Sequence, residues 1–176
     1  MPNGYSVFTS NIDGQFQKAG FEASRIHECH GSIHHLQCTV PCSPFIWPAE
    51  RFVPEVDERN CLLLNDRPRC PKCYQLARPN VLMFGDWEWL DGRQQLQASI
   101  QTRWLNQVEH PVVIEIGAGA AIPSVRRFSE QVIRRHNGRL IRINVRESEV
   151  GRTDDIGLAM GGLDALSAIE DALRFP

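Results

Sequence analysis

The chain has 176 residues, of which 42% are hydrophobic and 23% are charged, and its formal net charge is -2. A chain of this size forms about one domain, with room for a small insert, and it has enough apolar residues for a core. A net charge this close to zero gives no general attraction for nucleic acid or for an acidic membrane surface. We therefore expect neither of these as a direct partner.

No stretch has the basic start, apolar middle and small-residue end of an export signal, and no apolar run is long enough to span a bilayer. We therefore expect a cytoplasmic protein whose six cysteines are reduced. Reduced cysteines that lie close together in a sequence favour a metal site over a disulfide framework.

Three short apolar runs predict β-strands, at 5–9, 112–116 and 139–145. They are continuous rather than alternating, which is typical of parallel strands covered on both faces. Three other segments, 94–108, 125–135 and 158–173, carry apolar residues every three or four positions, which predicts helices whose apolar stripes pack in the core. Together they predict an α/β fold: a Rossmann-like parallel sheet with flanking helices.

The middle of the chain differs, because it holds most of the prolines and cysteines and shows little periodicity. We predict a zinc-binding insert over residues 38–78, while 1–37 and 79–176 form the Rossmann-like domain. Two close pairs of cysteines lie in the insert, and each can form a tight loop that directs both sulfurs inward. Four thiolates in a tetrahedron, with no open position, are typical of structural zinc. The predicted ligands are Cys38, Cys42, Cys70 and Cys73.

The two other cysteines have no such partner. Cys61 precedes three leucines, Leu62 to Leu64, which suggests burial, and Cys29 is also expected to pack.

One of the histidines is a candidate for chemistry. His30 is followed by Gly31, which would let the backbone turn and leave the imidazole open to a ligand. A neutral imidazole can take a proton from a hydroxyl group. From spacing alone, a packed or surface histidine is the stronger alternative for any one of His27, His30, His34 and His35.

Two loops follow predicted strands, at Thr9–Gly14 and at Gly117–Gly119. In open α/β sheets, ligands bind beyond the carboxyl ends of the strands. Backbone N–H groups of a glycine loop can face a phosphate or a ribose. An ordinary tight turn is about as good an explanation of either loop.

The order of the motifs resembles the sirtuin family of NAD-dependent protein deacylases. The matching segments run through nearly the whole chain, as TSNIDGQFQKAG, ECHGS, the four cysteines, RPNVLMFGD, IEIGAG and IRINVRE. Three departures lie within the motifs: Ser10, where the family usually has Gln, Asp86, where Glu is more usual, and Ala118-Gly119, where the family has Thr-Ser after the matching glycine.

The resemblance implies a role for each motif. It makes His30 the catalytic base and places Asn11 and Asp13 among the catalytic residues. A segment that pairs with the backbone of the substrate would include Met83, Phe84 and Gly85. The residues implied to contact NAD are Ser10, Asn11, Ile12, Asp13, His30, Gly117, Ala118, Gly119 and Asn144.

The activity implied is removal of an acyl group, such as acetyl, from a lysine of a protein or peptide. The acyl-lysine oxygen displaces nicotinamide, the histidine deprotonates a ribose hydroxyl, and the acyl group leaves on ADP-ribose. Two alternatives stay open. One is a sirtuin-like ADP-ribosyltransferase or NAD hydrolase. The other is a non-catalytic, zinc-stabilised module that binds acyl-lysine or another protein.

The sequence lacks the Gly-Ala-Gly loop and the Gly-Ile-Pro-Asp-Phe-Arg motif that precede these segments in the family. We therefore expect a fragment or a short relative with a newly exposed strand edge. Because that segment supplies many of the N–H donors for the cofactor, we expect the 176-residue chain to bind NAD weakly and to turn over slowly or not at all.

Overall fold

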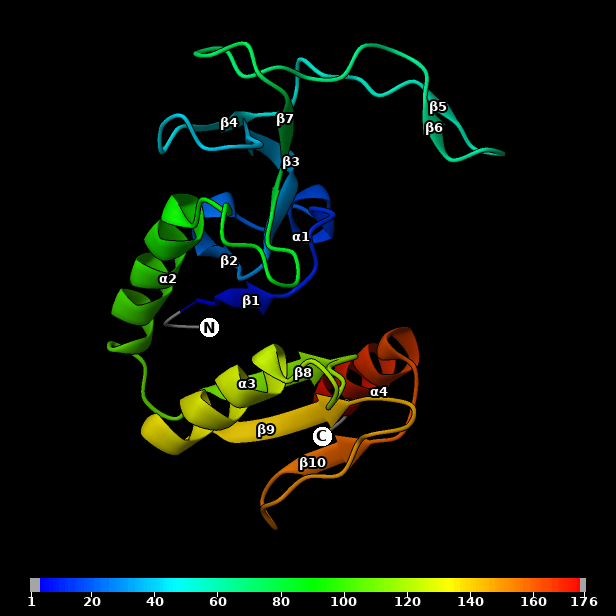
Figure 1. Ribbon diagram of the computed structural model, residues 1–176. Coiled ribbons are helices and arrows are strands. Elements are labelled where there is room, and N and C mark those ends of the chain that lie inside the picture. The colour runs from blue at the N-terminus through cyan, green and yellow to red at the C-terminus, as the bar shows by residue number, and fades with distance from the viewer. Residues whose placement is uncertain (1–3, 175–176) are drawn as a thin grey trace. The chain divides into compact units, whose positions relative to one another are not determined.

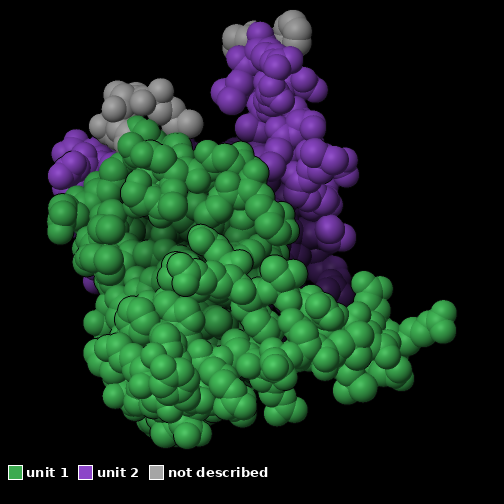
Figure 2. Space-filling model, turned by 90° about the horizontal axis from the view of Figure 1, so that it is seen from above, with its two compact units in different colours: residues 1–104 green, residues 105–176 purple. Residues whose placement is uncertain are grey.

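The structure is a computed structural model that describes residues 4–174. The chain divides into two compact units, residues 1–104 and 105–176, which Figure 2 colours separately. None of the helices in the described part of the chain is long and apolar enough to cross a bilayer.

The first unit begins with a pair of parallel strands, β1 (Val7–Thr9) and β2 (Ile26–Glu28), in which Thr9 pairs with Glu28. Because the strands are parallel, the residues that follow each of them emerge at the same end of the sheet. The connection between them contains helix α1 (Gln15–Lys18) and a 3-10 turn, η1 (Ala23–Arg25).

An antiparallel sheet follows, with β3 (Gly31–Cys38) between β4 (Ile46–Pro48) and β7 (Ala77–Val81) (Figure 1). β7 is an edge strand, which suits Pro79 because proline has no N–H to donate to a further strand. Between β4 and β7 the chain forms a small hairpin of β5 (Val56–Asp57) and β6 (Leu62–Leu63). Helix α2 (Gly92–Leu105) comes next.

Helix α2 packs on β1 and β2 through polar side chains. The buried Gln101 donates to the Ser6 hydroxyl at 2.9 Å and to the Val7 carbonyl at 3.1 Å. Gln97 accepts from the Glu28 amide at 3.1 Å. The face of α2 that meets β1 and β2 therefore contacts them through glutamines, of which Gln101 is buried and Gln97 is half-buried.

The second unit is a parallel three-stranded sheet in the order β10 (Ile156–Leu158), β9 (Arg139–Ile143) and β8 (Val112–Ile116). Helix α3 (Ser124–Arg135) connects β8 to β9, and α4 (Gly162–Arg174) follows β10. The core of this unit contains Val132, Ile133, Leu140, Ile143 and Ala165.

A buried ion pair crosses this second sheet. The Arg142 Nε donates to the Glu115 Oε1 at 2.5 Å, and an Arg142 Nη1 donates to the Glu149 carbonyl at 2.7 Å. Both charged partners are nearly inaccessible to solvent. The guanidinium therefore links the middle of β8 to the loop that follows β9.

The α/β fold with parallel strands is confirmed, but three packing predictions are wrong. β8 is not covered on both faces, since Val112, Ile114 and Ile116 are exposed. The apolar stripes predicted for two helices are largely outside the core: Val108 is buried, but the exposed side chains include Leu96, Ile100, Leu163, Leu166 and Leu173. Cys61 and Leu62 to Leu64 are also exposed, because they lie on the hairpin of β5 and β6, which has only two residue pairs.

Of the described strands, β1, β8 and β9 were expected from the sequence, whereas β2 to β7 and β10 are additional. Most of the additional strands have three residues or fewer, which is too short for a periodic signal, and neither β3 nor β7 contains a continuous apolar run. The division into a 38–78 insert and a Rossmann-like domain stays a prediction.

Candidate active site and metal centre

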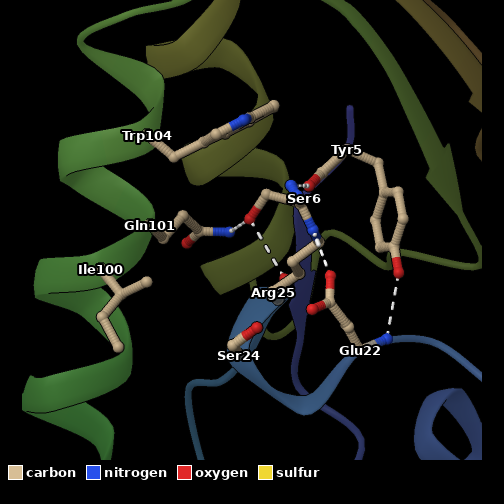
Figure 3. A pocket seen from close by; sticks show the side chains of 8 residues that line it. All are labelled: Tyr5, Ser6, Glu22, Ser24, Arg25, Ile100, Gln101 and Trp104. Atoms are coloured by element: carbon tan, nitrogen blue, oxygen red, sulfur yellow. Dashed lines mark hydrogen bonds and ion pairs between the residues drawn. The ribbon is translucent and has the colours of Figure 1, made fainter. Parts of the chain in front are cut away.

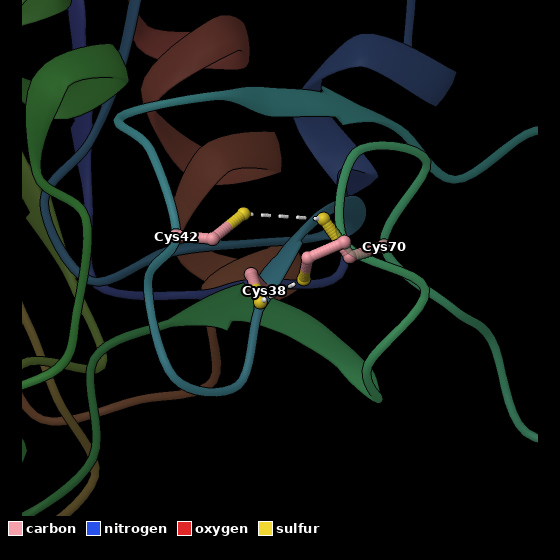
Figure 4. Close-up of side chains that lie close together, drawn as sticks. Cys38, Cys42 and Cys70 are labelled. Atoms are coloured by element: carbon pink, nitrogen blue, oxygen red, sulfur yellow. Dashed lines mark hydrogen bonds between the residues drawn. The ribbon is translucent and has the colours of Figure 1, made fainter.

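Four thiols converge in the first unit, and they belong to Cys38, Cys42, Cys70 and Cys73. Figure 4 labels the first three of these cysteines. All four Sγ atoms lie within 4.8 Å of one another. Two of the separations are 3.6 Å, between Cys38 and Cys73, and 3.7 Å, between Cys42 and Cys70. Thiolates at 2.3 Å from a tetrahedral zinc are roughly 3.8 Å apart, so the cluster fits that ion.

Two tight loops position these thiols. Cys38 is the last residue of β3, and Cys42 lies in the turn that follows. The second loop is closed by hydrogen bonds from the Tyr74 amide to the Cys70 carbonyl, at 2.9 Å, and from the Cys70 amide to the Gln75 carbonyl, at 2.8 Å. Each closely spaced pair of cysteines therefore lies on one tight loop, a cysteine knuckle, and the two knuckles face each other.

The electrostatics of the four thiols also suit a cation. A backbone N–H at Cys73 lowers the pKa of Cys70 to about 7, so this thiol ionises readily. Burial raises the pKa of Cys38, and the neighbouring Cys73 sulfur raises that of Cys42 to about 12. A divalent metal ion would remove this mutual repulsion and allow all four thiols to ionise.

The loop after β1 meets the segment after β2. The Cys29 amide donates to the Thr9 carbonyl at 2.9 Å, and the Ile33 amide donates to the Ile12 carbonyl at 3.0 Å. His34 Nε2 donates to the Asp13 carbonyl at 3.0 Å. The structure thus brings the Asn11–Asp13 loop and the His30-Gly31 pair to the same end of the parallel strands.

The glycine beside His30 has a clear structural reason. Gly31 has φ 81°, and a β-carbon at this position would overlap the Asn80 carbonyl oxygen of β7. The Leu82 amide donates to the His30 carbonyl at 2.9 Å, which ties the backbone of His30 to the residue after β7. Gly31 therefore lets β3 and β7 approach closely where the half-buried His30 lies.

The predicted nicotinamide loop is shaped by its own side chains. The Asn11 amide donates to the Thr9 hydroxyl at 3.0 Å. Asp13 Oδ1 accepts from the Gln15 amide, at 3.3 Å, where α1 begins. Ser10 and Ile12 are half-buried between them. The catalytic and cofactor roles of these residues stay predictions.

Sequence reasoning missed the residues that hold β2 beside this loop. The buried His27 lies between Gln101 Oε1, 2.8 Å from its Nδ1, and Gln94 Nε2, 2.8 Å from its Nε2. The buried Glu28 pairs with Arg93. The available signal was the spacing of glutamines at 94, 97 and 101, which places all three on one face of a helix.

The predicted substrate segment follows β7, whose last two residues are buried, and is itself exposed. Phe84 is 93% exposed and Met83 is 60% exposed. Gly85 has φ 68°, so the chain turns there. These residues therefore form an exposed turn that directly follows the edge strand β7.

The second unit carries the other predicted cofactor residues. Asn144 Nδ2 donates to the Ala118 carbonyl at 3.1 Å, so the loop after β8 and the residue after β9 lie together. Gly117 has φ 68°, and added β-carbons at Gly117 and Gly119 would meet nothing closer than Glu147 Oε2, 3.8 Å from position 119. A loop this open fits close approach of a ribose to the backbone, as NAD would require.

A separate cavity of about 200 Å³ lies in the first unit, and none of the predicted site residues lines it. Figure 3 shows that its polar groups bond to one another: Arg25 pairs with Glu22, and the Tyr5 hydroxyl accepts from the Glu22 amide at 3.0 Å. These bonds hold η1 against the start of β1. Its other lining residues are Ser6, Ser24, Ile100, Gln101 and Trp104.

Comparison with known proteins identifies a family that the chain matches. A model described as the Sir2 family matches residues 3–122. The NAD-dependent protein deacylase of Pyrococcus furiosus is 27% identical over 170 residues, which cover 96% of this chain and 61% of that protein. The NAD-dependent protein deacylase of Aquifex aeolicus is 25% identical, with coverage of 98% and 63%. The chain thus spans about three fifths of the length of these relatives.

Solved structures share the fold. A Sir2Tm structure bound to a propionylated peptide superposes with a TM-score of 0.66 at 20% identity, covering 97% of this chain and 65% of that one. The complex of a Sir2 homolog with NAD also gives 0.66 at 20% identity, with coverage of 96% and 58%.

Proposed function

The chain belongs to the Sir2 family, and we propose that it acts in NAD-dependent removal of acyl groups, such as acetyl, from lysines of proteins. The observation that carries this proposal is the meeting of the Asn11–Asp13 loop with His30-Gly31 at the carboxyl ends of two parallel strands. The named activities of the curated relatives support it, and those relatives are longer than this chain.

Each part of the first unit has a task in this proposal. His30 would accept a proton from a hydroxyl group presented beside the Asn11–Asp13 loop. The free edge of β7 and the residues after it would bind an extended peptide by adding a strand. NAD, when bound, would supply the ADP-ribose that accepts the acyl group and would release nicotinamide. The zinc would hold the two cysteine loops together, at a structural site.

The proposed partner is an acyl-lysine protein or peptide, and the proposed location is the cytoplasm. All six cysteines are free thiols in the structure, which suits a reducing compartment.

The test is product analysis with the zinc-loaded chain in excess over an acetyl-lysine peptide and with NAD present. We expect weak NAD binding and slow or absent turnover, with any deacetylated peptide matched by nicotinamide and acetyl-ADP-ribose and lost in His30→Ala. Robust turnover would contradict the expectation of weak NAD binding and slow or absent turnover. Nicotinamide without deacetylated peptide would indicate an ADP-ribosyltransferase or NAD hydrolase instead. Peptide binding that ignores NAD and His30→Ala would indicate a binding module.

A further inference from the structure

The loop between β7 and α2 exposes two aromatic side chains almost completely. Phe84 is 93% exposed and Trp87 is 96% exposed. Large apolar side chains that are exposed together mark surfaces that bind other molecules. This loop directly follows the edge strand to which the proposed substrate would add.

The charge of the same loop is acidic. Residues 82–91 contain Asp86, Glu88 and Asp91 and no lysine or arginine. Arg78 neutralises Asp86 through two contacts of 2.8 Å. The Asp91 carboxylate accepts a hydrogen bond from the side-chain amide of Gln95 at 2.6 Å. Glu88 is exposed and has no ion-pair partner within residues 4–174. An uncompensated carboxylate therefore lies next in sequence to the exposed Trp87.

The backbone around these two residues is braced. Asp86 also accepts from the Met83 amide at 3.3 Å and from the Glu88 amide at 3.2 Å. The Glu88 carbonyl accepts from the buried Gln37 at 2.7 Å, and the Leu90 amide donates to the same side chain at 3.0 Å. The loop is thus ordered before anything binds, which lowers the entropy cost of binding.

We propose that Trp87 and Glu88 select acyl-lysine peptides that carry a Lys or Arg near the acylated residue. The face of a tryptophan attracts a cation, and the Glu88 carboxylate supplies the opposite charge beside it. An acidic residue at that position of the peptide would be repelled by the same carboxylate. This inference rests on the proposed function, because it requires an acyl-lysine peptide to bind along β7.

The test uses the complete, zinc-loaded chain and two acetyl-lysine peptides that differ only in their flanking residues, which are Arg in one and Gln in the other. We expect the Arg peptide to bind about tenfold more tightly in calorimetric titration, with a smaller ratio at high salt. Trp87→Ala and Glu88→Gln should each reduce the ratio roughly threefold. We expect the fold to tolerate both changes, because the Trp87 side chain is 96% exposed and the Glu88 bonds to the protein come from its backbone.

Glu58→Gln is the matched control, because Glu58 is an exposed carboxylate on the zinc insert, and it should leave the ratio unchanged. Equal affinities for the two peptides, or an equal loss in Glu58→Gln, would overturn the inference and leave the proposed function standing. If neither acetylated peptide binds, the proposed function fails together with the inference.

Discussion

Gly31 is the residue on which the geometry beside His30 depends most. Its positive φ and its contact with the Asn80 carbonyl both exclude a side chain. We expect Gly31→Ala to reduce the free energy of unfolding by about 3 kcal/mol or more, from strain and overlap together. Urea denaturation measures this loss.

Gly20→Ala is the matched control for this change. Gly20 also has a positive φ, 87°, but an added β-carbon there would meet nothing within 4 Å. Strain alone should cost about 1 kcal/mol. Equal losses in the two variants would show that the close approach of β3 and β7 is unimportant.

His27 should make the stability of the chain sensitive to pH. Burial lowers its pKa below the ordinary 6.5, and the two glutamines around it suit a neutral ring that donates through Nδ1. As the pH falls through 6.5, the unfolded chain takes up a proton that the folded ring refuses, so stability present at higher pH is lost.

The measurement for His27 is the free energy of unfolding between about pH 7.5 and about pH 5.5, with excess zinc present. We expect His27→Gln to flatten the decline with falling pH. Some slope should remain, because burial also lowers the pKa of His35. An unchanged slope in the variant would contradict this account of His27.

At the residue level, the sequence was informative where residues that lie close together in the chain already determine how their side chains are arranged in space. The four clustered cysteines belong to this class. His30 does not, because spacing alone favours a packed or surface histidine and only the family resemblance singles it out. The glutamines that hold His27 and Glu28 do not, because a polar residue on a helix is normally read as exposed. Their burial depends on which face of α2 meets β1 and β2, and that is a tertiary property.

At the level of elements, the zinc loops take the place of a hydrophobic core. The hairpin of β5 and β6 exposes most of its apolar side chains, and the cysteine knuckles lie at the ends of β3 and β7 where the insert begins and ends. A bound metal ion would therefore contribute folding energy to this region directly.

We expect Cys70→Ser to lose stoichiometric zinc and to make residues 38–78 open to proteolysis, because three thiolates bind a structural ion far less well. Cys61→Ser is the control, since Cys61 is exposed and outside the cluster. Metal analysis after gel filtration measures both variants. Retention of one zinc per chain in Cys70→Ser would contradict the four-ligand assignment.

The apolar runs of β8 and β9 and the helical period of α3 were predictable. What the sequence could not show is the exposure of β8, because a continuous apolar run is typical of a strand covered on both faces. Among the described residues, β8 pairs with β9 alone, and Val112, Ile114 and Ile116 remain exposed.

An apolar edge of this kind should promote association between copies of the chain. We expect the sedimentation coefficient of the 176-residue chain to rise with concentration and Ile114→Lys to suppress that rise. Val145→Lys is the control, since Val145 is also exposed but lies outside the strands. A monomer at every concentration, or equal suppression by the control, would contradict this prediction.

At the level of the whole molecule, the chain carries two sets of site residues in two compact units. The first unit holds the zinc cluster, His30 and the edge strand proposed for the substrate. The second holds the glycine loop and Asn144. The chain spans about three fifths of the length of its relatives. The property that we expect most clearly of it is the binding of acyl-lysine by the first unit.

Calorimetric titration of the zinc-loaded chain with an acetyl-lysine peptide, and with the same peptide unacetylated, tests that property most directly. The acetylated peptide is expected to bind at least about tenfold more tightly, because burying an uncharged acyl-lysine costs much less free energy than burying a lysine ammonium. Equal affinities for the two peptides, or no binding of the acetylated one, would contradict the account.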